Sequence, residues 1–253
     1  MRTSSRRRNG GPRRKALDTL VADDGHIPAI DGWFENVRPL TPRQKQLIAE
    51  GAKLNPEAQA KESLGVGRWI DNEPCVTSLE RFLSQPTVNI QGLVSGYTGQ
   101  GSKTVLPGRA ESKLEFRPVP AMTKDEAVSK LKAHLFKRGF HDVKVMVSGG
   151  YGPNETDENS PLVRAQKILF DRSKIAYSVT PRSAGSWPGV IFNGAPLNLP
   201  AFQFGVNRGS GAHAPNEWFL IKSVNPKVNG FDEAAMAFVD YLYFVAQEAG
   251  KSR

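Results

Sequence analysis

The stretch SKLEFRPVPAMTKDEAVSKLKAHLFKRGFHDVKVMV, residues 112–147, decides the fold that we expect for this chain. Polar and apolar residues alternate over 112–119, as in a strand with one buried face. Thr123 and Glu126 have the spacing of a capping box, and apolar residues recur at helical spacing over 127–135. A final alternation places three valines, Val143, Val145 and Val147. The stretch therefore predicts a strand, a helix and a strand in succession.

The residues before this stretch predict further elements of the same domain. Apolar residues over 88–94, interrupted by Gly92, indicate a strand, and residues 16–21 indicate one or two helical turns. Thr41 and Pro42 begin another helix as its cap and first residue. Together these elements predict a small α+β sandwich with an antiparallel sheet and two helices. The run Gly149 to Pro153 is rich in glycine and marks the boundary that we expect.

The C-terminal part has a different pattern, typical of a segment of an α/β domain. Ser160 and Pro161 begin a helix with one apolar face. Short buried strands are expected at 175–179, 190–192 and 201–205. The last helix is expected to bury one apolar face, formed by Ala235, Phe238, Val239, Leu242 and Val245.

The charge is concentrated at the N-terminus. The net charge is +9, and seven of these positive charges lie in residues 1–15, which contain no acid. A basic tail can touch nucleic acid, but this composition is also that of a solvated end. We predict a basic disordered tail over 1–15 and do not expect nucleic acid as a partner.

The composition excludes several classes of protein. No run approaches ~18 consecutive apolar residues, so we expect neither a membrane span nor a membrane partner. No apolar segment follows the N-terminal arginines, which excludes a secretory signal, and we expect a cytoplasmic protein. The single cysteine, Cys75, excludes a disulfide framework and a zinc site built from cysteines.

A few residues are candidates for chemistry, each with an ordinary alternative. His213 lies among small residues in a loop, so its ring can face a cavity or simply be exposed, and Glu217 could orient its neighbourhood as an acceptor. Arg117 lies on the alternating strand, where its guanidinium suits a carboxylate or a solvated face. The loop 182–188 offers hydroxyls and amides to a carboxylate, or is an ordinary turn. The glycine-rich run 96–104 is close to a phosphate-binding loop but has no helix after it, which favours a hairpin loop.

Three segments in this order and spacing, 86–107, 116–120 and 211–217, resemble one family. It is the family of dinuclear-zinc metallopeptidases that includes carnosinase-type dipeptidases, acetylornithine deacetylase and succinyl-diaminopimelate desuccinylase. Residues 24–40 also resemble the start of the lid domain in the dipeptidase-like branch. The resemblance extends over about residues 16–248, which is nearly the whole chain apart from the tail.

The resemblance implies a fold and a set of site residues. It assigns 16–149 to the dimerisation, or lid, domain and 150–253 to the C-terminal segment of an α/β zinc-hydrolase catalytic domain. A homodimer would form through the lid. By this resemblance His213 is a metal ligand and Arg117 binds the substrate's carboxylate. Thr104 is a lid residue that reaches the substrate in the partner subunit's site, and Ser186 and Gly185 belong to a loop that holds the substrate's carboxylate end.

The resemblance also implies that most of the catalytic apparatus precedes this chain. The family's other metal ligands and its general base lie before the lid, so we expect no catalytic residue here. One histidine cannot hold two zinc ions, since even one catalytic zinc normally has three protein ligands. We therefore expect a truncated or split C-terminal portion of a zinc-dependent dipeptidase or amidohydrolase, inactive alone, whose complete form acts on small peptides or N-acyl amino acids. The alternative is a non-catalytic homodimerisation module derived from such an enzyme.

Overall fold

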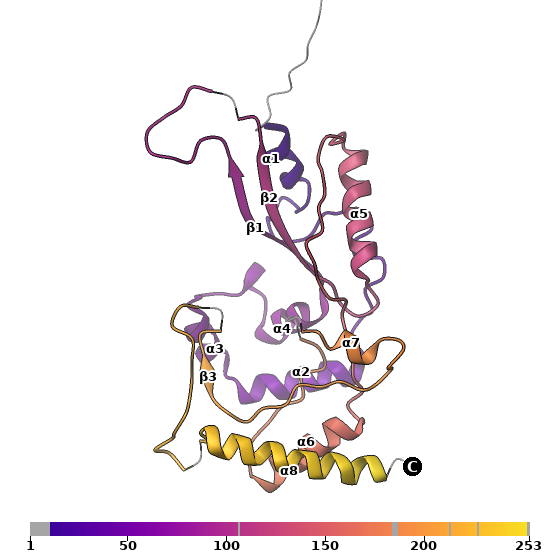
Figure 1. The fold of residues 1–253 in the computed structure, drawn as a ribbon, viewed down its shortest axis with the longest axis vertical. Coiled ribbons are helices and arrows are strands. Elements are labelled where there is room, and N and C mark those ends of the chain that lie inside the picture. Colours follow the sequence, from indigo (N-terminus) through magenta and orange to yellow (C-terminus); the bar gives the residue numbers. More distant parts are fainter. Residues whose placement is uncertain (1–10, 106, 184–186, 213, 227, 252–253) are drawn as a thin grey trace, which may run out of the picture. The chain divides into compact units, whose positions relative to one another are not determined.

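The computed structural model describes residues 11–251, except 106, 184–186, 213 and 227 (Figure 1). The described residues form helices and two small antiparallel sheets, which confirms the expected α+β fold class. None of the helices within the described ranges is long and apolar enough to cross a membrane. The elements in chain order are α1 (Gly11–Asp18), α2 (Pro42–Leu54), α3 (Glu57–Leu64), the 3₁₀ helix η1 (Ile70–Asn72), α4 (Cys75–Ser84), β1 (Thr87–Ser95), β2 (Ala110–Arg117), α5 (Lys124–Lys137), α6 (Pro161–Arg172), α7 (Val190–Asn193), β3 (Gly209–Ser210), β4 (Trp218–Phe219) and α8 (Phe231–Gly250).

The chain divides into two compact units whose segments alternate along the sequence. Unit 1 contains residues 1–45, 66–153 and 182–187. Unit 2 contains residues 46–65, 154–181 and 188–253. Each unit is described below by itself.

The strands β1 and β2 of unit 1 form the predicted antiparallel hairpin. Val88 pairs with Phe116 and Ile90 with Leu114, and the register then shifts between Ile90 and Gly92. The register skips Gln91, as it does at a β-bulge, where one strand has an extra residue. The glycine-rich run 96–104 lies in the loop that joins the two strands, as the hairpin interpretation predicted (Figure 1).

The helix α5 follows the hairpin and begins at the predicted cap. The Oγ1 of Thr123 accepts a hydrogen bond from the backbone N–H of Glu126 at 3.1 Å. This bond satisfies one of the N–H groups that have no partner inside the first turn of a helix.

We expect Thr123→Ala to lower the free energy of unfolding by about 1 kcal/mol, because the cap's side-chain acceptor is lost. Urea unfolding followed by circular dichroism measures this change. The matched control is Ser129→Ala, which changes an exposed hydroxyl residue in the interior of the same helix. An equal loss in both variants would contradict the capping role.

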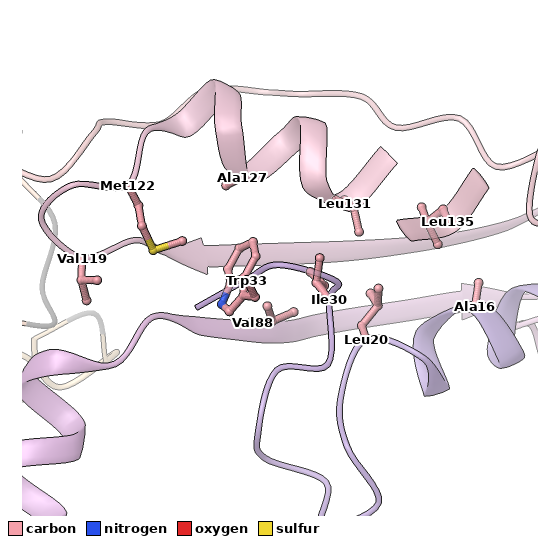
Figure 2. Packing of buried hydrophobic residues seen from close by; sticks show 10 residues of the cluster. All are labelled: Ala16, Leu20, Ile30, Trp33, Val88, Val119, Met122, Ala127, Leu131 and Leu135. Atoms are coloured by element: carbon pink, nitrogen blue, oxygen red, sulfur yellow. The ribbon is translucent and has the colours of Figure 1, made fainter. Parts of the chain in front are cut away.

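The core of unit 1 lies between the hairpin and α5. Figure 2 shows the Trp33 side chain between β1 and α5, with Val88 and Leu131 nearby. The ring of Trp33 also meets Phe116 edge to face, with 5.0 Å between the ring centroids. The buried cluster consists of Ala16, Leu20, Ile30, Trp33, Val88, Val119, Met122, Ala127, Leu131 and Leu135.

A buried histidine connects three segments of unit 1. His134 of α5 is fully buried, and its Nδ1 accepts a hydrogen bond from the backbone N–H of Asp31 at 3.1 Å. Its Nε2 lies 3.1 Å from Oγ1 of Thr19, whose hydroxyl donates to the carbonyl of Ala16. Since Nδ1 is an acceptor, the neutral ring carries its proton on Nε2 and donates it to Thr19.

Unit 2 contains a smaller core, between α6 and α8. Ala165, Leu169, Tyr241 and Phe244 form its buried cluster. The hydroxyl of Tyr241 donates to the carbonyl of Leu162 at 3.1 Å. The Ser160 cap of α6 is confirmed, since its hydroxyl oxygen accepts from the N–H of Val163.

Four predicted strands are wrong. The structure assigns no strand to 143–147, 175–179 or 201–205, and 190–192 form the short helix α7. In the first of these, Val143 and Val145 still pack against the core while Met146 and Val147 are exposed. Alternation therefore reported the burial of Val143 and Val145 but not the exposure of Val147, and it could not report strand pairing, which depends on a neighbouring strand. Runs of three to five apolar residues do not distinguish a strand from a helical turn.

The predicted buried face of the last helix is also wrong. α8 buries Ala234, Tyr241, Phe244 and Glu248. Ala235, Phe238, Val239 and Leu242 are exposed, and Val245 is half-buried. Apolar residues lie on two faces of this helix, so periodicity alone could not choose the face that packs.

The first helix begins earlier than expected. It covers Gly11–Asp18, whereas the pattern predicted helical turns over 16–21. The helix predicted from Thr41 begins at Pro42, as expected, and continues to Leu54.

Candidate functional site

Arg117 and Thr104 lie on the same hairpin of unit 1. Arg117 is the last residue of β2, where it pairs across the ladder with Thr87. Its guanidinium donates to Oε1 of Glu115 at 2.9 Å, and its side chain is 36% exposed. Thr104 is exposed in the loop between β1 and β2. Arg117 therefore lies at the base of the hairpin, and Thr104 lies in its loop.

A second, very short hairpin in unit 2 frames the predicted metal-ligand loop. Gly209 pairs with Phe219 and Ser210 with Trp218, so residues 211–217 form the connecting loop. Gly211 begins the loop with φ +76°, a conformation that favours glycine. The predicted ligand His213 lies outside the described residues.

Glu217 is the last residue of this loop and is exposed. Its backbone N–H donates to the carbonyl of Ala214 at 3.1 Å, which closes a tight turn. A Cβ at position 211 would lie 3.3 Å from the Cα of Glu217, so the small residue allows the two ends of the loop to approach. Glu217 is therefore held close to the base of the hairpin. Its role toward His213 stays a prediction.

The third candidate segment is the loop 182–187, which belongs to unit 1. Gly185 and Ser186 lie outside the described residues. Arg182, at its start, is buried and donates from Nη1 to the carbonyl of Arg38 at 3.2 Å. The sequence offered no signal for this anchor, because an arginine beside a proline and a serine in a turn is usually exposed.

The ion pairs around Asp31 were also missed by sequence reasoning. Its carboxylate accepts from Lys137 Nζ at 2.9 Å and from Arg138 Nη2 at 2.9 Å. Hydrogen bonds from Arg138 and then Lys137 hold the pKa of Asp31 well below its usual range. These residues are about a hundred positions apart, so no local pattern could pair them. They fasten the loop before Trp33 to α5.

The donor groups of the described part of the chain do not form a metal centre. No group of three or more His, Cys, Asp or Glu side chains in the residues that the structure describes could hold a metal ion. A catalytic zinc normally has three protein ligands, so the described residues do not by themselves fit the zinc pair that the resemblance implies.

Comparison with known proteins finds peptidases of one family. Residues 15–143 match the peptidase dimerisation domain of the M20 family. The Cys-Gly metallodipeptidase of Saccharomyces cerevisiae is 28% identical over 218 residues, which cover 80% of this chain and 43% of that protein. The beta-Ala-His dipeptidase of Rattus norvegicus is 32% identical over 121 residues, which cover 47% of this chain and 23% of that protein.

The fold agrees with a solved structure of the same kind. The M20 family metallo-carboxypeptidase of Sulfolobus solfataricus superposes with a TM-score of 0.71 at 29% identity. The superposition covers 92% of this chain and 54% of that enzyme. This chain therefore spans about half the length of the enzymes that it resembles.

Proposed function

This chain belongs to the M20 peptidase family, and we propose on that premise that it is the C-terminal part of a dipeptidase-like metallohydrolase. The complete enzyme would hydrolyse a peptide or amide bond next to a free carboxylate, in a dipeptide or an N-acyl amino acid. The observation that carries the proposal is the match of the dimerisation domain over residues 15–143. The alignment with a Cys-Gly metallodipeptidase over 80% of the chain supports the choice of substrate class.

The boundary between the two domains would lie at the glycine-rich run 149–153. Residues 16–149 would be the lid, and residues 150–253 the C-terminal segment of the catalytic domain. Arg117 would grip the substrate's carboxylate, because its planar guanidinium matches a carboxylate with two parallel N–H donors. Glu115, bound to it at 2.9 Å, would hold that guanidinium in position. Thr104 would reach the substrate from the lid, and the loop with Gly185 and Ser186 would bind the carboxylate end.

The metal would be zinc in the complete enzyme. His213 would be one ligand, and Glu217 would orient the loop that carries it. The remaining ligands and the general base would come from the half of the fold that this chain does not span. On its own the chain is expected to be inactive.

The second candidate function is a homodimerisation module without catalysis. It is favoured by the matched dimerisation domain and by the sheet of unit 1, which has two strands among the described residues and so two edges open to pairing. Val94 on β1 is 61% exposed. We propose a homodimer both for the enzyme and for the module without catalysis, since the matched domain is a dimerisation domain.

The experiment compares the chain alone with a fusion behind the N-terminal half of the yeast Cys-Gly metallodipeptidase, both supplied with zinc. We expect hydrolysis of Cys-Gly by the fusion and none by the chain alone. In the fusion, Arg117→Ala should reduce kcat/KM by about 10- to 100-fold, as expected for a lost charge-assisted contact. The matched control is Arg109→Ala, because Arg109 also pairs with a glutamate two positions away but has a side chain that is 76% exposed.

Three outcomes would change the assignment. An inactive fusion that sediments as a dimer would favour the module without catalysis. Turnover by the chain alone that His213→Ala abolishes would refute the expected inactivity. Equal losses for Arg117→Ala and Arg109→Ala would remove the carboxylate role of Arg117.

A further inference from the structure

His26 lies between two segments of unit 1 and faces an oxygen atom with each of its ring nitrogens. Its Nδ1 is 3.2 Å from the backbone carbonyl oxygen of Asp24 in its own turn. Its Nε2 is 3.2 Å from Oδ2 of Asp71 in η1, which lies 45 positions further along the chain. The side chain of His26 is 24% exposed, so solvent reaches the ring only in part.

Both of these oxygens are hydrogen-bond acceptors. A carbonyl and an ionised carboxylate cannot donate, whereas a neutral imidazole has one donor and one acceptor. A neutral ring can therefore satisfy only one of the two contacts, and its other nitrogen would face an oxygen with lone pair against lone pair. The protonated ring has an N–H group on each nitrogen and donates to both oxygens. The observed contacts therefore fit the charged ring.

The charged groups that face the ring keep their charge over the range in which a histidine titrates. Asp24 has its Oδ1 3.6 Å from Nδ1, and hydrogen bonds from the backbone N–H groups of His26 and Ile27 lower the pKa of Asp24. Asp71 accepts from Nη1 of Arg81 on α4 at 3.0 Å, and this bond, followed by the contact with His26, lowers the pKa of Asp71. Arg81 stays protonated. Histidine is the residue type whose charge changes between about pH 5 and 8, so protonation of His26 is the variable in this cluster.

The segment that His26 contacts has an unusual backbone. Asp71 and Asn72 each have φ 54°, in the left-handed region that residues other than glycine rarely occupy. Such a conformation persists where the surrounding structure holds it. Arg81 binds Asp71 and also Glu73, directly after the two left-handed residues. His26 adds a contact from a distant part of the sequence, which joins η1 to the turn before it.

We propose that His26 is a pH-sensitive latch, which fixes η1 to the turn of residues 24–27 when protonated and releases η1 as the pH rises. Release follows because the neutral ring loses one of its two hydrogen bonds and its attraction to the carboxylate. Helix α4 follows η1 and leads into β1, whose first residue Thr87 pairs with Arg117. The latch therefore acts on the segment that leads to the strand pair of the candidate carboxylate-binding arginine. It involves neither substrate nor metal and does not rest on the proposed hydrolysis.

Amide hydrogen exchange of the full chain, measured by solvent-exchange NMR, tests the latch. The probes are the N–H groups of Asn72 and Glu73, which donate within η1 to the carbonyls of Trp69 and Ile70. Their protection, corrected for the intrinsic pH dependence of exchange, should be about threefold higher at about pH 5.5 than at about pH 8, the size expected for a partly exposed ion pair. The midpoint of this change should coincide with the titration of the His26 ring, followed by its nitrogen NMR shifts.

Two substitutions at position 26 separate the charge from the side chain. In His26→Ala, protection of the η1 amides should be independent of pH and no higher than that of the parent at about pH 8. In His26→Arg the side chain is always charged and can donate to the Asp71 carboxylate, so protection should stay high at both pH values. The matched control is His141→Ala, which removes an exposed histidine of unit 1 that packs on Phe136 and should keep the threefold difference.

Several outcomes would overturn the latch. One is equal protection at both pH values in the parent chain, and another is a pH effect that survives in His26→Ala. Lower protection in acid, which a general loss of stability would cause, would overturn it as well. High protection in His26→Arg would show that a substitution at this position leaves the fold intact. The hydrolysis experiment measures the activity of the fusion, so its failure would leave this test unaffected.

Discussion

Replacing Trp33 by alanine is expected to lower the free energy of unfolding by about 3–5 kcal/mol, the largest effect of any single substitution proposed for this chain. The indole is 1% exposed and lies between β1 and α5 (Figure 2). Its removal deletes the edge-to-face contact with Phe116 and leaves a cavity at the centre of the core. Urea unfolding followed by circular dichroism gives the change.

Two further variants make the Trp33 experiment specific. Trp218→Ala removes the same side chain from a position that is 52% exposed and should cost about 1 kcal/mol or less. Trp33→Phe should cost much less than Trp33→Ala, because phenylalanine keeps an aromatic ring in the core and leaves a smaller cavity. If Trp33→Ala and Trp218→Ala lose equal stability, the central position of Trp33 in the core is refuted.

Acidification is expected to destabilise unit 1 through His134. Burial, followed by the nearby charge of Arg138, lowers the pKa of His134 below its ordinary value of 6.5, against the opposing effect of Asp31. The unfolded chain therefore binds a proton more readily than the folded chain. The stability that neutral His134 contributes should be fully present above about pH 6.5. It should decrease as the pH drops below that value and be lost once the pH is below the pKa of His134 in the folded chain.

Protonation would also break a specific contact. A proton on Nδ1 would face the backbone N–H of Asp31, which now donates to that nitrogen at 3.1 Å. The Asp31 carboxylate, 3.5 Å from Nδ1, limits the loss, and its own contribution weakens only in stronger acid because its pKa is lowered. The nearby cations Arg138 and Lys137 both bind that carboxylate.

The measurement is the free energy of unfolding in urea at intervals from pH 8 to pH 5. His134→Phe should lower stability by about 1–3 kcal/mol at pH 8, because the N–H of Asp31 loses its acceptor, and should flatten the slope between pH 7 and 5. The exposed His141 provides the control: His141→Phe should preserve that slope. An unchanged slope in His134→Phe would exclude His134 as its source.

The parts of the fold that could be predicted from the sequence are those with local causes. The cap at Thr123, the helix start at Pro42 and the hairpin 88–119 depend on residues close together in the chain, and the structure contains all three. The strands expected at 175–179 and 201–205 failed because a strand exists only where another strand pairs with it. For the candidate site, residue types and order suggested Arg117 and Glu217, whose roles stay predictions, but no local pattern indicated that Arg182 is buried.

The sequence by itself indicated the family and the elements with local causes, such as the hairpin and the starts of α2, α5 and α6, because capping residues, turn glycines and apolar periodicity act over a few positions. Only the tertiary structure decided that His134 connects α5 to Asp31 and Thr19, since these contacts join residues more than a hundred positions apart. It also decided which apolar face of α8 is covered. Periodicity records that a face is apolar, but burial depends on which surface packs against it, and α8 has two such faces with one covered.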